Sequence, residues 1–138
     1  METNAKGAAG VILDADSGEV IALASLPSFN PNRSDLAYND LVFNRVSNQV
    51  YELGSTFKPI TVASAIDAGV ITDLATRYPA VPFQIGKFTI HDSHNFGASL
   101  NVPEALIHSS NIVLAQIGDE IGSQRLSGTL RALGFSER

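Results

Sequence analysis

Cysteine is absent from this chain of 138 residues, which excludes disulfides, thiolate zinc sites and cysteine nucleophiles. Long apolar segments are absent too, since no uninterrupted run approaches the roughly 20 residues that a membrane-spanning helix needs. The first residues lack the charged start, apolar stretch and cleavage site of a signal peptide. We therefore expect any membrane anchor of the full-length protein to lie outside this chain.

Basic residues are few. The sequence has 9 Lys and Arg against 14 Asp and Glu, and it contains no basic stretch of the kind that binds nucleic acid. Its hydrophobic content of 44% is enough for a buried core and unlike that of a disordered segment. The length is that of one domain, so we expect residues 1–138 to belong to a single domain.

The N-terminal segment predicts a β-hairpin. Ala8–Leu13 and Val20–Ala24 are short apolar stretches rich in Val and Ile, and the turn formers Asp14–Glu19 lie between them. From Leu26 to about Asn48, prolines and asparagines favour a loop.

A helix is predicted at Thr61–Ala68, an apolar run that ends at Gly69. Proline lacks the backbone donor of a helix interior and is tolerated only in the first turn. Because Pro59 precedes the run, we expect the helix to begin near Gly54 or Ser55.

The remaining sequence is mainly helical. Residues 72–99 are predicted to be connecting segments with one short strand at Phe88–Ile90. Asn101–Glu104, with an early proline, is typical of a capped helix start, and further helices are predicted at Ile112–Ile117 and Ser123–Leu133. Two strands followed by helices indicate an α+β fold with too few strands for a complete sheet.

Ser55 and Lys58 form the first candidate site. A serine hydroxyl is a weak nucleophile that needs a base nearby, and their spacing places both side chains on one helix face. Burial beside Phe57 and Ile60 would ease loss of the lysine proton, and the helix N-terminus favours a developing oxyanion. The pair suits acyl transfer, although on spacing alone a capping serine and a surface lysine are the commoner arrangement.

Ser109-Ser110-Asn111 is the second candidate. It interrupts the helical pattern, where a hydroxyl and an amide can both point into a cleft. Ser109 would then relay a proton, and Asn111 would hold Lys58 or a substrate amide. Taken alone, however, this tripeptide is more typical of a helix cap.

His91-Asp92-Ser93-His94 brings two imidazoles and a carboxylate together, as in some metal sites. Zinc needs three or four ligands with matched geometry, and no convincing third ligand follows, since His108 is not obviously near. We interpret this segment as a turn with solvated histidines and expect no metal.

The segment Tyr51–Pro59, with the sequence Tyr-Glu-Leu-Gly-Ser-Thr-Phe-Lys-Pro, closely resembles the active-site serine motif of class B penicillin-binding proteins. The similarity extends to Gly10–Pro31, to the Asn44-Arg45 pair and to His91–Asn111, so nearly the whole chain matches in order. Two ordered motifs with suitable neighbours are far more specific than either alone.

This resemblance implies an incomplete α+β domain of the β-lactamase/transpeptidase-like fold, present as its N-terminal portion. It implies a peptidoglycan D,D-transpeptidase that binds stem peptides and β-lactams, without a cofactor. Ser55 would be the nucleophile and Lys58 the base. Ser109 would pass the proton to the leaving amine, and Asn111 would orient the substrate. Other cell-wall synthesis or division proteins would be partners, on the periplasmic side of the bacterial inner membrane.

Two features depart from the family pattern. Leu53 stands where proline is common, and the third motif, Lys-Thr-Gly or Lys-Ser-Gly, is absent. We therefore expect this chain alone to be inactive or weakly active and, through an unpaired strand edge, to self-associate. The alternatives are a β-lactamase or β-lactam sensor of the same fold, or a non-catalytic structural or partner-binding fragment. The match is slightly closer to the division type than to the elongation type.

Overall fold

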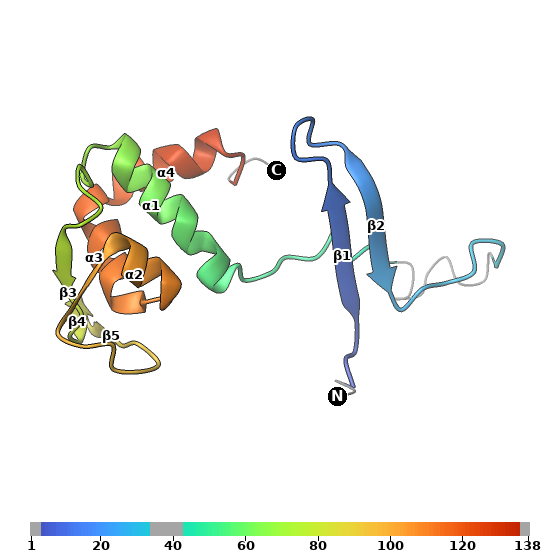
Figure 1. The fold of residues 1–138 in the computed structure, drawn as a ribbon. Coiled ribbons are helices and arrows are strands. Elements are labelled where there is room, and N and C mark those ends of the chain that lie inside the picture. The colour runs from blue at the N-terminus through green and yellow to red at the C-terminus, as the bar shows by residue number, and fades with distance from the viewer. Residues whose placement is uncertain (1–3, 34–42, 136–138) are drawn as a thin grey trace. The chain divides into compact units, whose positions relative to one another are not determined.

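The computed structural model describes residues 4–33 and 43–135, which belong to two units, Met1–Glu52 and Leu53–Arg138 (Figure 1). The first unit contains a two-stranded hairpin, and the second contains the helices with two further pairs of short strands. Each helix in the described ranges is too short or too polar to span a bilayer.

The hairpin pairs β1 (Ala8–Leu13) with β2 (Val20–Leu26) in antiparallel register. Asp14 holds its turn, because the carboxylate accepts hydrogen bonds from the N–H of Ser17 at 2.8 Å and from its hydroxyl at 2.9 Å. These contacts, the N–H first, lower the pKa of the Asp14 carboxyl. The predicted hairpin is confirmed, and its second strand runs two residues beyond the predicted end at Ala24.

Large apolar side chains of this hairpin remain accessible to solvent. Their exposed fractions include 60% for Ile12 and 65% for Ile21. Ser25 on β2 anchors the segment after the loop, since its hydroxyl accepts from the Arg45 N–H at 3.0 Å. Apart from Leu26, which ends β2, the predicted loop has no helix or strand in its described parts, and residues 34–42 lie outside the described residues.

The second unit begins with a 3-10 helix, η3 (Gly54–Phe57), that leads into α1. Its remaining elements are α1 (Lys58–Asp67), β3 (Arg77–Pro79), β4 (Phe83–Ile85), β5 (Phe88–Ile90), β6 (Ser99–Asn101), α2 (Val102–Ile107), α3 (Asn111–Ile121) and α4 (Ser123–Ala132). β3 pairs with β6 and β4 pairs with β5, both antiparallel.

The core of this unit lies where α1, α2 and α3 meet. Ala65, Ala105, Val113 and Ile117 have no exposed surface. The buried positions of α3 recur at helical spacing, which gives the helix one apolar face toward the core: Val113, Leu114, Ile117 and Ile121. This packing fixes the helix ends that carry the candidate site residues.

Several predicted boundaries need correction. The chain turns helical at Gly54, as expected, but this first turn is a 3-10 helix, and the α-helix begins only at Lys58 with Pro59 in its first turn. The predicted helix at Ile112–Ile117 is longer, running from Asn111 to Ile121.

Three short strands were not predicted from the sequence. The predicted strand at residues 88–90 is confirmed as β5, but β3, β4 and β6 were missed, so strands also lie between α1 and α2. Three residues are too few to display the alternation that marks a strand in a sequence. The α+β class itself is confirmed.

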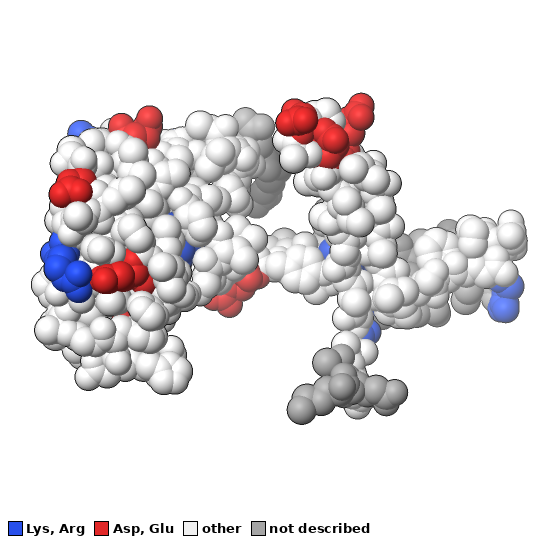
Figure 2. Space-filling view, in the orientation of Figure 1, with Lys and Arg blue, Asp and Glu red and all other residues white. Residues whose placement is uncertain are grey.

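Charged side chains are distributed without a large basic area on the visible face. In Figure 2, Lys and Arg form small separate spots among the described residues, and Asp and Glu form others.

Candidate active site

Ser55 lies in η3, one turn before the first residues of α1, and its side chain is exposed. Gly54 precedes it with a φ of +55°, a left-handed conformation that glycine adopts without steric cost. Lys58 starts α1 and is half-buried, and its N–H donates to the Ser55 carbonyl. The 3-10 turn therefore sets the Ser55 hydroxyl at the amino end of the helix.

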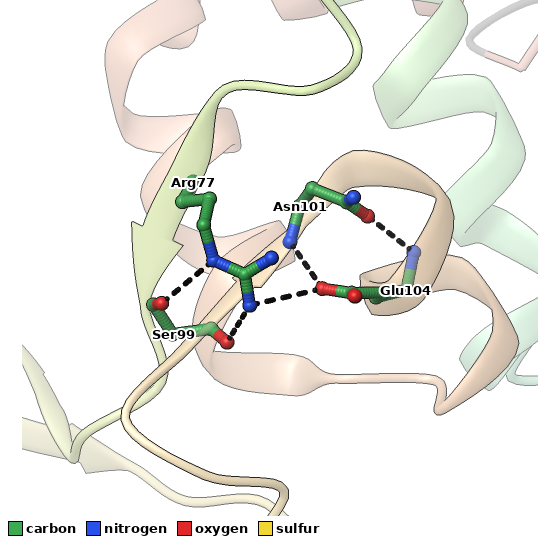
Figure 3. Close-up of polar contacts among 4 residues, drawn as sticks. All are labelled: Arg77, Ser99, Asn101 and Glu104. Atoms are coloured by element: carbon green, nitrogen blue, oxygen red, sulfur yellow. Dashed lines mark hydrogen bonds and ion pairs between the residues drawn. The ribbon is translucent and has the colours of Figure 1, made fainter.

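The amino end of α2, the helix that precedes the second candidate motif, is anchored by polar contacts (Figure 3). Asn101 and Glu104 form a capping box, in which each side chain accepts the other residue's N–H at 2.9 Å. Arg77 of β3 donates to the Ser99 hydroxyl at 2.9 Å and pairs with Glu104 at 3.2 Å. The predicted cap is confirmed, and it ties the start of α2 to the β3–β6 pair.

Between α2 and α3 the chain makes a sharp break. Ser109 has a φ of +54°, a left-handed conformation that is uncommon for residues other than glycine. Ser110 is fully buried and caps α3, since its hydroxyl accepts from the Val113 N–H at 3.1 Å. With Ser110 turned inward, Ser109 and Asn111 are left on the side of Lys58.

The ammonium of Lys58 is the centre of the cluster. Its Nζ donates to the Ser109 hydroxyl at 2.9 Å, to the Asn111 side-chain oxygen at 2.7 Å and to the Ser109 carbonyl. The Ser109 hydroxyl in turn donates to the Ser55 hydroxyl at 2.9 Å. All four residues that the sequence singles out are thus brought together by η3, α1 and the α2–α3 break.

No hydrogen bond joins the side chains of Ser55 and Lys58, both of which lie within the described residues. The hydroxyl of Ser109 stands between them and contacts both. A proton leaving Ser55 in this arrangement would reach Lys58 through Ser109, a link that the spacing of the first motif could not reveal.

Burial lowers the pKa of Lys58 below the usual lysine value of 10.5, because desolvation disfavours the charged amine. The negative charge of Asp92 acts in the opposite direction and raises it. A lowered pKa leaves a larger fraction of the amine neutral and able to accept a proton at a given pH, so the cluster is suited to activating a hydroxyl nucleophile.

His94 and His108 both pack against the ring of Phe96. His94 contacts the Ser93 hydroxyl at 3.0 Å, and His108 stacks on the Phe96 ring with centroids 4.7 Å apart. Within the described ranges, no three His, Asp or Glu side chains come together as a metal site would require. Asp92, which lies in the segment interpreted as a turn with solvated histidines, reaches the start of α3. Sequence reasoning missed it, because its partners lie far along the chain.

Residues 8–138 match the family described as the penicillin binding protein transpeptidase domain. The chain belongs to this family. The match covers both candidate motifs of the chain and agrees with the resemblance seen in its sequence.

Curated members of the family are similar over almost the whole chain. A probable peptidoglycan D,D-transpeptidase FtsI from Caulobacter vibrioides is 40% identical over 136 residues, which are 99% of this chain and 23% of that protein. A probable peptidoglycan D,D-transpeptidase PenA from Neisseria gonorrhoeae is 35% identical over 97% of this chain, again 23% of that protein. The chain therefore spans about a quarter of the length of these transpeptidase relatives.

Solved penicillin-binding proteins have the same fold. Pseudomonas aeruginosa PBP2, crystallised in complex with WCK 5153, matches with a TM-score of 0.81 and 25% identity over 94% of this chain and 33% of that chain. Helicobacter pylori PBP2 matches with a TM-score of 0.78 and 27% identity over 94% of this chain and 27% of that chain.

Proposed function

We propose that the full-length protein carrying this chain is a peptidoglycan D,D-transpeptidase, which cross-links stem peptides by serine acyl transfer. The observation that carries the proposal is the hydrogen-bonded series from Ser55 through Ser109 to Lys58. The names of the two curated relatives support it. Because the family match runs through both units, we assign residues 1–138 to one part of a single transpeptidase domain.

In the first half-reaction, Ser55 Oγ forms a bond to the carbonyl carbon of the penultimate D-alanine. When Lys58 is neutral, its lone pair accepts the Ser109 proton, and Ser109 accepts the proton of Ser55. The proton then passes to the nitrogen of the terminal D-alanine as its bond to the carbonyl carbon breaks. An acyl-enzyme on Ser55 and free D-alanine result, with no proton gained or lost.

In the second half-reaction, the amine of another stem peptide attacks the acyl carbon, and the bond to Ser55 Oγ breaks. The amine proton returns along the same series to Ser55. Asn111 orients the donor peptide while its side-chain oxygen holds Lys58 at 2.7 Å. The backbone N–H of Ser55, at the amino end of a helix, contributes to stabilising the oxyanion.

β-Lactams are expected to acylate the same serine. Support comes from penicillin-binding protein A of Mycobacterium tuberculosis, solved as a ceftriaxone acyl-enzyme complex, which is 27% identical with a TM-score of 0.70.

We place the full-length protein on the periplasmic side of the inner membrane, where peptidoglycan is cross-linked. Septal cell division is the favoured role, since an FtsI protein from Escherichia coli also matches, with 29% identity over 133 residues. Other cell-wall synthesis or division proteins would then be its partners.

The test is acylation of the full-length protein by benzylpenicillin, followed by intact mass spectrometry and peptide mapping. We expect one adduct on Ser55, which Ser55→Ala abolishes. Thr56→Ala is the matched control and should keep the adduct, because that hydroxyl is engaged with the Leu53 carbonyl at 2.6 Å. Rapid penicillin hydrolysis would favour a β-lactamase, and an unlabelled protein would contradict the proposal.

A further inference from the structure

Asp92 lies outside the four proposed site residues, in the segment between β5 and β6. Both of its carboxylate oxygens are nevertheless used by the second motif. Oδ2 accepts from the Ser110 hydroxyl at 2.7 Å, and Oδ1 accepts from the N–H groups of Asn111 and of Ile112, the latter at 3.0 Å. One side chain thus binds three consecutive residues.

These bonds complete the amino end of α3. The first N–H groups of a helix have no partner within it and need an acceptor from elsewhere. Here Asp92 serves Asn111 and Ile112, and the Ser110 hydroxyl serves Val113. A negative charge is favourable at this end of the helix dipole, and bonds to a carboxylate are stronger than those between neutral groups.

The same segment also decides which way the Asn111 amide points. Its nitrogen donates to the His91 carbonyl at 3.2 Å. With the nitrogen held there, the side-chain oxygen is the atom that faces Lys58, which it accepts from at 2.7 Å. Residues 91 and 92 therefore fix both the backbone and the amide of Asn111.

We propose that Asp92 is a positioning residue of the transpeptidase site. By holding residues 110–112, it places the Ser109 hydroxyl and the Asn111 oxygen at hydrogen-bonding distance from Lys58. This inference rests on the proposed function, and it assigns Asp92 no contact with substrate. Its effect should therefore appear in the rate of the acylation step and not in the affinity of the preceding non-covalent complex.

Two substitutions separate position from charge. Asp92→Asn retains an oxygen for the two N–H groups and an amide nitrogen that can donate to Ser110, but it has no charge. Asp92→Ala removes every contact. Asn101→Ala is the matched control, because it removes a helix cap in the same unit, on α2, and leaves the contacts of Asp92 intact.

The experiment follows penicillin acylation of the full-length protein in time and separates the acylation rate constant from the dissociation constant, with a melting curve for each variant. Misplacing a reacting group by about 1 Å can cost about 100-fold, and loss of an orienting partner about 10–100-fold. We expect Asp92→Ala to lower the rate constant by about 10–100-fold with little change in the dissociation constant. Asp92→Asn should restore it to within about 10-fold of wild type.

Each other outcome overturns the inference. Wild-type acylation by Asp92→Ala would show that position does not depend on this carboxylate. An equal loss in Asn101→Ala would assign the effect to general stability. If Asp92→Ala does not fold, Asp92→Asn decides. A folded Asp92→Asn that acylates as slowly as Ser109→Ala, which lacks the relay hydroxyl, would show that Asp92 acts through its charge and not by positioning. A wild type that is not acylated would sink the proposed function as well, whereas the other results leave it standing.

Discussion

The variants Ser109→Ala and Ser109→Gly together test the proton path. Ser109 has both a bridging hydroxyl and a left-handed backbone, and comparison of the two variants separates the effects of these properties. Its hydroxyl lies between Ser55 and Lys58, at 2.9 Å from each. Its backbone has a φ of +54°, which glycine adopts freely and alanine does not. Both substitutions remove the hydroxyl, but only glycine relieves the backbone.

The expected magnitudes differ accordingly. Loss of a general acid–base group costs about 10²–10⁴ in rate, or about 3–5 kcal/mol of transition-state stabilisation. The left-handed conformation costs an ordinary residue about 1–2 kcal/mol, so the glycine variant should be more stable than the alanine variant by about that amount. Lys58 stays in place in both, since the residue 109 carbonyl and the Asn111 oxygen remain as acceptors.

The assay measures acylation rate constants of the full-length protein with benzylpenicillin, beside melting temperatures. We expect both variants to be slow to the same degree, although glycine melts higher. If Ser109→Gly recovered wild-type acylation, the loss in alanine would stem from strain and not from the missing hydroxyl. If Ser109→Ala were itself as fast as wild type, the relay would be refuted.

Three further outcomes are expected. The acylation rate should rise with pH and level off below pH 10.5, because the neutral amine is the reactive form and burial lowers the pKa of Lys58, although Asp92 opposes this shift. A rate that still rises at or above pH 10.5 would contradict this. Ile117→Ala should lower the free energy of unfolding by about 2–5 kcal/mol in urea titrations, whereas Ile107→Ala, at a position 78% exposed, should change it by less than about 0.5. This chain alone should elute as a dimer or larger in size-exclusion chromatography with light scattering, since β1 and β2 pair only with each other among the described residues and expose apolar side chains. Ile21→Lys should reduce the association, and a monomeric wild type would argue against this prediction.

Local features were predictable because their determinants lie within a few residues. The hairpin follows from a turn that Asp14 closes on itself, and the start of α2 follows from Asn101 and Glu104, three positions apart. The four site residues were also named from the sequence, since their motifs are short. Their proximity in space results from the packing of α1 against α3, which cannot be predicted from any single segment of the sequence.

Contacts between distant segments were not predictable. β3 pairs with β6, whose residues lie 20 to 24 positions further along the chain, and three residues leave no alternation to detect. Asp92 is 18 residues from Ser110, and its segment was interpreted only as a turn with solvated histidines. The bridging role of Ser109 depends on a positive φ, which a serine in the sequence does not indicate.

The series of three polar groups also has an isotopic consequence. If Ser55 lost its proton directly to an amine, one hydrogen would be in flight, and the acylation rate would fall linearly as deuterium replaces hydrogen in the solvent. With a hydroxyl interposed at 2.9 Å on both sides, two hydrogens shift together, from Ser55 to Ser109 and from Ser109 to Lys58. The rate should then fall along a curve that bows below the straight line.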